Sequence, residues 1–336
     1  MPQFAPVRVY YEKSILTYFQ GRALFDQFQD QGIPLIEIED HNRIPELREL
    51  PDIEFPKMKR YLVLGIRKSL RLLPNNRSAD FIVPFTSSGC SAMCLYCYLV
   101  CTFFKNSYLR IFINRQEMMN QIKRNASKQT RTKIYEIGSN SDLVLENQIT
   151  GNLKWAIEEF SRLENARCTF ATKFANVDDL LDIDHRGKTQ IRISVNPPDL
   201  IRKVEIGTAN LTARIGAANK MFHAGYRVGL NLAPIILTDD WQQQYLELLE
   251  ELSSKLDDRL QQNTFFELIF MTYGLANDTI NCISLPKAAN IFDKGKMQPK
   301  GRGKYCYKSE IHSNAAFFFQ QELARRFPKA KISYIV

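Results

Sequence analysis

The sequence has no long apolar run, either at its start or elsewhere. None of its segments reaches the roughly 18 consecutive apolar residues that a membrane-spanning helix needs. The longest run, residues 94–104, is interrupted by Thr102 and stopped by Lys105. Residues 1–16 carry Arg8, Glu12 and Lys13, so they lack the continuous apolar core of a secretory signal. We therefore expect a cytoplasmic protein without a membrane span.

Cysteine is scarce, and its count is odd. The 336 residues hold seven cysteines, and in a reducing compartment these act as thiols or metal ligands rather than as a disulfide framework. Lys and Arg number 45 against 36 Asp and Glu, a net charge of +9. This balance permits an anionic partner such as nucleic acid without proving one.

No internal repeat or low-complexity tract is present, and short β-rich runs alternate with longer amphipathic runs. This alternation is typical of an α/β fold. The expected strands cover residues 80–85, 133–137, 168–173, 190–195, 226–233 and 264–270. The expected helices cover residues 115–124, 152–163, 177–181, 211–224, 240–256 and 314–327. Six βα units in sequence predict parallel strands in a partial (β/α)6 TIM-like barrel or an open sheet, with functional residues at the carboxyl ends of the strands.

Two helix boundaries and three regions follow from local signals. Residues 238–240, Thr-Asp-Asp, predict a helix start with a side-chain cap, and Gly225 predicts a helix end. We expect a small N-terminal α/β extension over residues 1–78, the partial barrel over 79–275, and a C-terminal cap with a basic loop over 276–336.

Cys90, Cys94 and Cys97 form a C-x3-C-x2-C motif directly after the first expected barrel strand. Three thiolates on one short loop suit a multi-iron cluster, because neighbouring irons lie close enough for one segment to ligate three of them. The fourth iron then stays open for a substrate or cofactor. A structural zinc site is the alternative; it usually needs four protein ligands, and Cys101 is the nearest fourth candidate.

Further blocks follow the cysteine motif in a fixed order. They are Tyr96 and Tyr98; Glu136, Ser141 and Asp142; Thr172, Lys173 and Phe174; Ser194 and Asn196; Ala233, Pro234 and Ile235; and residues 266–269, Phe-Glu-Leu-Ile. With the motif, this order resembles the radical S-adenosylmethionine enzymes and, within them, the spore photoproduct lyase family, from about residue 5 onward. Taken singly, each residue equally fits a turn, a cap or a solvated side chain.

The resemblance implies two cofactors, a 4Fe-4S cluster on the three cysteines and S-adenosyl-L-methionine on its open iron. It implies that Ser141, Lys173, Ser194 and Ala233, with Asn196 beside them, hold the second cofactor. These residues all fall at or just past the ends of expected strands, where a ligand pocket belongs.

The resemblance also implies a reaction. A 5'-deoxyadenosyl radical would start the reversion of spore photoproduct, the methylene-bridged thymine dimer of ultraviolet-damaged spore DNA, to two thymines. The implied partners are that damaged DNA and an electron donor such as flavodoxin or ferredoxin, in the cytoplasm or in the spore core. The oligomeric state is not implied.

One position departs from the family. Its members carry a cysteine that donates a hydrogen atom to the thymine radical, and that position holds Ser139 here. An aliphatic O–H bond is much stronger than an S–H bond, so another thiol must donate or repair fails. We expect Cys101 to be this donor and Tyr98 and Tyr96 to relay the radical. Cys101 equally fits a small buried hydrophobe, and Tyr98 a packed aromatic.

Three other thiols are alternative candidates for the hydrogen-atom donor. Cys168 opens its expected strand, about 16 Å from the end at Lys173, so it should lie at the wrong end of the barrel. Cys282 and Cys306 stay open as alternatives.

The expected DNA contacts lie in the basic loop of the cap. The family carries a Gly-x-Gly-Lys-Tyr block after a hairpin that is thought to wedge into DNA, and this chain retains Gly301, Gly303, Lys304 and Tyr305. Pro299 and Lys300 replace an Arg-aromatic pair. We expect Lys300, Arg302, Lys304 and Tyr305 to contact DNA and the binding to depend on salt. The alternative is a solvated loop.

Two other functions stay open. One is a different radical S-adenosylmethionine enzyme on the same scaffold, which lost repair when residue 139 became serine. The other is a DNA-binding protein that a structural metal stabilises without catalysis.

Overall fold

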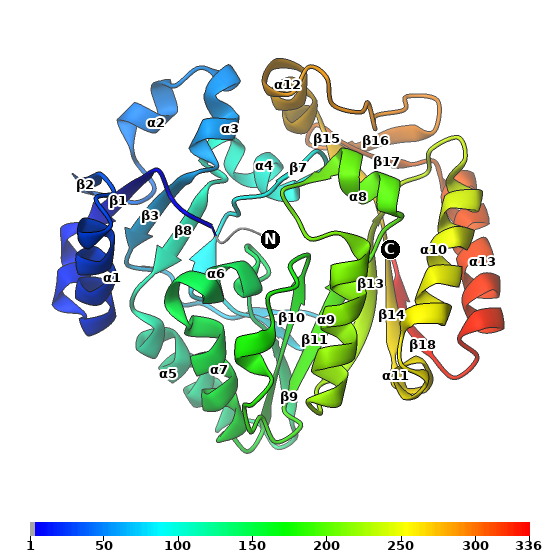
Figure 1. Ribbon diagram of the computed structural model, residues 1–336, viewed down its shortest axis with the longest axis horizontal. Helices are drawn as coiled ribbons and strands as arrows, with labels where there is room; N and C mark the ends of the chain where they lie inside the picture. The colour runs from blue at the N-terminus through cyan, green and yellow to red at the C-terminus, as the bar shows by residue number, and fades with distance from the viewer. Residues whose placement is uncertain (1–3) are drawn as a thin grey trace. The chain divides into compact units, whose positions relative to one another are not determined.

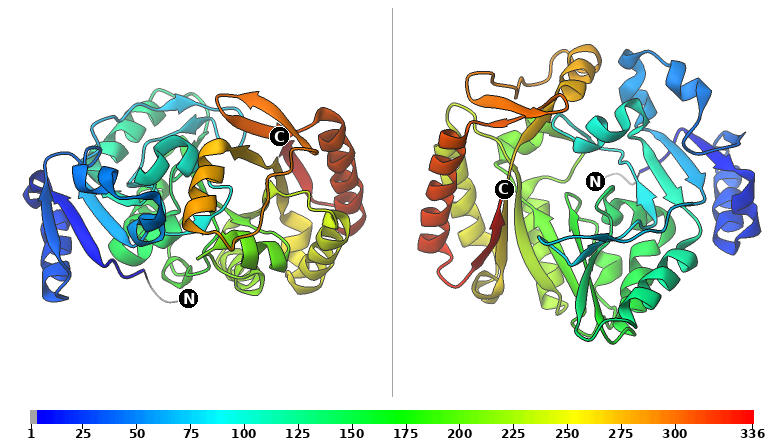
Figure 2. Two further views of the ribbon diagram at one scale, coloured as in Figure 1. Left: turned by 90° about the horizontal axis from the view of Figure 1, so that it is seen from above. Right: turned by 180° about the vertical axis from the view of Figure 1, so that it is seen from behind.

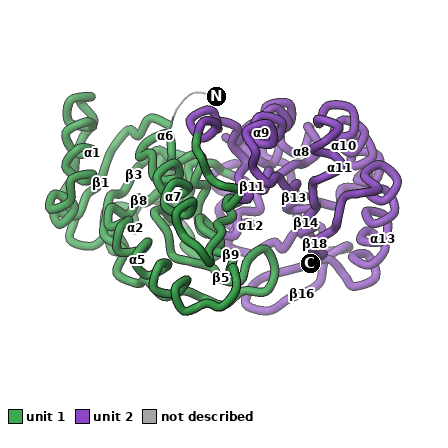
Figure 3. Tube along the Cα trace, turned by 90° about the horizontal axis from the view of Figure 1, so that it is seen from below, with its two compact units in different colours: residues 1–93, 102–170, 183–189 green, residues 94–101, 171–182, 190–336 purple. Residues whose placement is uncertain are grey.

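The computed structural model describes residues 4–336 apart from the side chain of Lys105 (Figure 1). The chain divides into two compact units, which Figure 3 shows in green and purple. The first unit comprises residues 1–93, 102–170 and 183–189, and the second comprises residues 94–101, 171–182 and 190–336. In the described part of the chain, no helix has the length and apolar character needed to cross a membrane.

A five-stranded sheet opens the first unit. Its strand order is β2-β1-β3-β8-β6, with β1, β2, β3 and β8 parallel and β6 antiparallel to β8. The bounds are β1 Arg8–Glu12, β2 Leu35–Ile38, β3 Tyr61–Gly65, β6 Ser87–Ser88 and β8 Leu109–Phe112. The apolar run of β3 is buried along its whole length, because helices cover the sheet: α1 Phe19–Asp30, α2 Pro45–Glu49 and α3 Phe55–Met58.

The first unit also holds the opening strands of the βα series. β5 (Phe81–Ile82) pairs in parallel with β9 (Lys133–Glu136), which pairs in parallel with β10 (Ala166–Thr172), while β4 (Leu73–Pro74) is antiparallel to β5. The expected strand over residues 80–85 is therefore shorter than predicted. The helices are α5 Arg115–Ala126, α6 Leu143–Thr150 and α7 Asn152–Ser161. Asp142, from the block shared with the family, caps α6 by accepting hydrogen bonds from Val144 and Leu145 N–H.

The second unit carries four parallel strands in the order β11-β13-β14-β18. Their bounds are β11 Thr189–Ser194, β13 Arg227–Ile235, β14 Phe265–Phe270 and β18 Lys331–Ile335. The helices are α8 Pro198–Val204, α9 Leu211–His223, α10 Trp241–Lys255, α11 Asp258–Asn263 and α13 Ser309–Arg326. In Figures 1 and 2, α10 and α13 lie side by side, where Tyr245 packs edge-on against Phe319 with ring centroids 5.0 Å apart. The edge strand β18 was not predicted.

The predicted helix boundaries hold, but one cap was wrong. Gly225 ends α9 with a φ of 86°, the left-handed conformation that favours glycine. Asp240 precedes α10, yet its side chain accepts from Thr238 and Gln244 instead of capping the backbone. The expected helix over residues 177–181 is a short 3-10 turn, Asp178–Leu180.

A small antiparallel sheet in the second unit lies partly within residues 276–336, the predicted C-terminal cap. β17 (Lys304–Tyr307) lies between β15 (Thr272–Gly274) and β16 (Met297–Gly301), and α12 (Leu275–Ser284) follows β15. The chain reverses between β16 and β17 at Arg302 and Gly303, whose φ values are 52° and 69°. The basic loop of the sequence is therefore a hairpin.

Candidate functional site

The first cysteine of the motif is fixed at the end of β6 in the first unit. Gly89 precedes it with a φ of 80°, and a Cβ there would lie 1.8 Å from the Tyr108 carbonyl oxygen, so only glycine fits. The Cys90 N–H donates to the Ser107 carbonyl at 3.1 Å. The buried Lys59 ammonium donates to the carbonyls of Cys90 at 3.0 Å and Ser107 at 2.8 Å. A positive charge thus lies against the backbone of Cys90.

The turn that carries Ser139 and Ser141 meets the same end of β6. Gly89 N–H donates to the Asn140 carbonyl at 2.8 Å, and Gly89 forms a parallel bridge with Ser141. The hydroxyls of Ser87 and Ser141 are 2.7 Å apart. Within the first unit the structure therefore brings together Cys90, the predicted cofactor residue Ser141, and the half-buried Ser139.

The cysteines of the motif have the donor set of an iron-sulfur cluster. Cys90, Cys94 and Cys97 are all partly exposed, and no disulfide forms among residues 4–336. The Ala92 N–H already points at the Cys90 sulfur, at 3.4 Å. Such a donor stabilises a thiolate ligand. Three partly exposed thiols with the C-x3-C-x2-C spacing are therefore suitable ligands for a 4Fe-4S cluster.

The other two cysteines belong to residues 94–101 of the second unit, where three backbone contacts hold the loop. Leu95 N–H donates to the Val204 carbonyl at 2.9 Å. Two side-chain amides one turn apart on α12 also bind the loop. Asn277 donates to the Cys97 carbonyl at 2.9 Å, and Asn281 donates to the Leu95 carbonyl at 2.8 Å. The loop is thus tied to the end of α8 and to α12.

Tyr96, between these two cysteines, points inward onto a buried ion pair. Its side chain is only 9 % exposed, and its hydroxyl donates to Glu205. Arg214 donates to the other Glu205 oxygen at 2.5 Å, with both side chains fully buried. Burial opposes ionisation of Glu205, but the charges of Arg214 and Lys173 outweigh it and lower the pKa of this carboxyl. Burial, reinforced by the Glu205 charge, raises the pKa of Tyr96 well above its usual value.

The same ion pair reaches the carboxyl end of β11. Arg214 donates to the Ser194 carbonyl at 3.0 Å, and the Asn196 amide donates to Glu205 at 2.9 Å and to the Pro234 carbonyl at 3.1 Å. Two predicted cofactor residues, Ser194 and Asn196, are therefore held by the pair that binds Tyr96.

Lys173 joins this group from the end of β10. Its ammonium donates to the Ala233 carbonyl at 2.8 Å and lies 5.7 Å from the centre of the Tyr96 ring. In the second unit, the structure thus brings together Tyr96, Lys173, Ser194, Asn196 and Ala233, which the sequence placed at the ends of separate strands.

Cys101 lies on the same loop, at α4 (Tyr98–Phe103). Its S–H donates to the Asn277 side-chain oxygen at 2.8 Å, and a Cβ on Gly274 would lie 2.3 Å from its sulfur. Burial raises the pKa of the Cys101 thiol, while the positive charge of Lys304 opposes this shift. Tyr98 is half exposed, at 50 %.

The remaining thiols differ in access. Cys168 is fully buried in β10 beside the Thr189 hydroxyl, 3.3 Å away, and burial raises its pKa to about 12. Cys282 is exposed on α12, and Cys306 is half-buried on β17 opposite Thr272. Of these three thiols, Cys168 is therefore the one without solvent access.

The predicted DNA residues lie on the β16–β17 hairpin. Lys300 and Arg302 are exposed, and Lys304 is half-buried. Tyr305 packs edge-on against Phe292, with ring centroids 4.9 Å apart. The hairpin thus presents its cations to solvent, while an aromatic contact supports its base.

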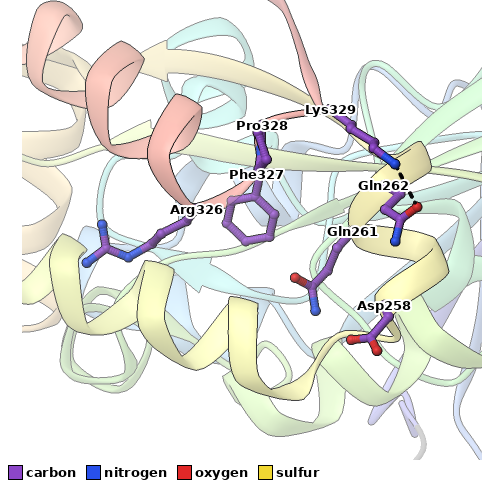
Figure 4. A pocket seen from close by; sticks show the side chains of 7 residues that line it. All are labelled: Asp258, Gln261, Gln262, Arg326, Phe327, Pro328 and Lys329. Atoms are coloured by element: carbon purple, nitrogen blue, oxygen red, sulfur yellow. Dashed lines mark hydrogen bonds between the residues drawn. The ribbon is translucent and has the colours of Figure 1, made fainter.

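Figure 4 shows a hollow in the second unit. It is lined by Asp258, Gln261, Gln262, Arg326, Phe327, Pro328 and Lys329. These residues precede β14 and β18 in the chain, so the hollow lies at the amino ends of those strands. The carboxyl ends, where α/β folds bind ligands, hold the residues described above.

Comparisons with known proteins agree over the whole chain. The family model "Spore photoproduct lyase" matches residues 4–336. Spore photoproduct lyases of Bacillus subtilis (strain 168) and Geobacillus sp. (strain Y412MC61) are each 34% identical, over 98% and 99% of both chains. The chain belongs to the spore photoproduct lyase family.

The solved structures of this family confirm the fold class. A spore photoproduct lyase double mutant with bound AdoMet and dinucleoside spore photoproduct matches with a TM-score of 0.94 and 30% identity, over 100% of both chains. This match confirms the predicted α/β fold, a parallel partial barrel of the radical S-adenosylmethionine type. It also confirms the family that the sequence motifs resemble. Enzymes of this type use a 4Fe-4S cluster and S-adenosylmethionine.

Sequence reasoning missed the buried pair under Tyr96. Arg214 was detectable, since it interrupts the apolar stripe that Leu211, Ile215 and Ala218 form on α9. A charged residue in such a stripe is almost always paired. Glu205, between Val204 and Ile206, gave a weaker signal of the same kind.

Proposed function

We propose that this chain is a DNA repair lyase that reverts spore photoproduct to two thymines by breaking a carbon–carbon bond, with S-adenosylmethionine as cofactor. The main support is that the chain is similar to spore photoproduct lyases over its full length. One solved structure of such a lyase holds AdoMet and dinucleoside spore photoproduct. The retained cysteine loop supports it further.

In this proposal Cys90, Cys94 and Cys97 hold the cluster, while Lys173 and Ser194 bind the S-adenosylmethionine. Ser141, Asn196 and Ala233 complete the cofactor site. When bound, these cofactors supply a 5'-deoxyadenosyl radical that abstracts hydrogen from the lesion. The protein orients the cofactor: the Lys173 ammonium suits a carboxylate, and strand-end backbone suits the adenine.

We propose Cys101 as the hydrogen donor in place of Ser139. It lies on the same loop as two of the cluster cysteines, and Asn277 links its S–H to the Cys97 carbonyl. Its raised pKa keeps the proton on sulfur at neutral pH, which a hydrogen-atom donor requires. Tyr98 and Tyr96 are the proposed relay residues.

On the substrate side we propose that the hairpin contacts the DNA. Lys300, Arg302 and Lys304 would neutralise phosphates, and Tyr305 would support the opened duplex. A lesion must leave the helix to reach a barrel site, at a cost of a few kcal/mol that is smaller where damage weakens stacking. The proposed electron donor is a flavodoxin or ferredoxin, and the proposed place of action is the cytoplasm or spore core.

The test is anaerobic. The reconstituted protein is mixed with dinucleotide spore photoproduct, S-adenosylmethionine and dithionite, and 5'-deoxyadenosine and restored thymidine dinucleotide are quantified. We expect both products.

Other outcomes favour the alternatives. 5'-Deoxyadenosine without restored thymines would favour another radical enzyme on this scaffold. Zinc in the purified protein, without iron or sulfide, would favour a DNA-binding protein with a structural metal.

A further inference from the structure

The Tyr96 hydroxyl lies where the loop of the second and third cysteines meets a buried charge. Residues 94–101 also touch their unit through neutral contacts, such as the backbone bond from Leu95 to Val204 and the amide of Asn277. The bond from Tyr96 to Glu205 is charge-assisted, and such bonds are roughly twice as strong as neutral ones.

Glu205 is built to stay charged and in place. Its carboxylate accepts from Tyr96, Asn196 and Arg214, and its side chain has no exposed surface. Arg214 is fixed in turn by the carbonyls of Ala209 at 2.8 Å and Ser194 at 3.0 Å. A buried carboxylate with three donors cannot shift without leaving one of them unpaired.

The pair therefore links two parts of one site. At one end it holds the loop between Cys94 and Cys97. At the other it holds the strand end of Ser194 and Asn196, where the proposed cofactor binds. We propose that Glu205 and Arg214 are positioning residues, which fix the cysteine loop to the cofactor-binding end of β11 through the Tyr96 hydroxyl. The part that concerns the cofactor rests on the proposed function.

The test removes the hydroxyl and leaves the ring. Tyr96→Phe is compared with the parent and with Tyr226→Phe, a control that removes the hydroxyl of another buried tyrosine, bonded to the Leu180 carbonyl at 2.6 Å. Amide hydrogen exchange is measured on the full chain before iron is added. We expect the Leu95 amide to exchange at least about tenfold faster in Tyr96→Phe, the effect of losing one hydrogen bond to a charged group. Tyr226→Phe should leave it unchanged.

A second readout uses the reconstituted protein. At equal iron content, Tyr96→Phe and Glu205→Gln should each bind S-adenosylmethionine at least about tenfold more weakly and change the cofactor-induced shift in the electron paramagnetic resonance of the reduced cluster. Parent-like exchange at Leu95 together with parent-like affinity would overturn the proposal. Because neither readout uses a lesion, failed repair in the parent would count against the proposed function and leave this inference standing.

Discussion

Glu205→Ala is the most informative single change, because it strands a fully buried cation. The side chains of Glu205 and Arg214 both have 0 % exposure, and removing one partner of a buried pair costs about 3–5 kcal/mol. In a cooperative unit of about 150–250 residues, 1 kcal/mol moves the Tm by about 2–4 °C. We therefore expect the Tm of the metal-free protein to fall by about 6–20 °C.

Scanning calorimetry measures this change against a matched control. Asp199→Ala also removes a carboxylate that pairs with cations, Arg202 and Lys203, but that group is exposed. Solvent screens such pairs, so the control should melt with the parent. A Glu205→Ala midpoint within about 2 °C of the parent would refute the argument that this pair is buried and essential.

Three further predictions concern the donor and the pH response. Ser139→Cys should raise the yield of restored thymidine dinucleotide per 5'-deoxyadenosine, because it returns a weak S–H bond to the turn beside the cysteine motif; an unchanged ratio would contradict this. Cys101→Ala should keep 5'-deoxyadenosine formation and abolish restored thymines in product analysis, whereas Cys306→Ala should form both products as the parent does; full repair by Cys101→Ala would exclude this donor. Burial opposes ionisation of Glu12, but hydrogen bonds from His41 and backbone N–H groups outweigh it and lower the carboxyl pKa below 4.5. Its stabilisation is complete above the ordinary pKa and is lost as the pH falls through the lower folded value, so below pH 4.5 the Tm of Glu12→Gln should depend less on pH than that of the parent.

The alternating pattern predicted the parallel strands well, because β-branched runs bounded by turns report burial directly. Gly225 also marked a helix end correctly, because glycine readily adopts the left-handed conformation that follows a helix. The pattern missed β18, a half-exposed edge strand, because its burial depends on pairing with β14. It also assigned a capping bond to Asp240, whose side chain instead binds Thr238 and Gln244.

The sequence by itself determined the cysteine motif, the family and the departure at Ser139, since ligand spacing and residue identity are written along the chain. Only the tertiary structure decided which residues meet. It placed Lys173 on the Ala233 carbonyl and joined Cys101 to Asn277, 176 residues away. It also buried Glu205 and Arg214 beneath Tyr96. Those contacts come from strands and helices distant in sequence, and a local pattern carries no information on which distant partner neutralises a buried charge.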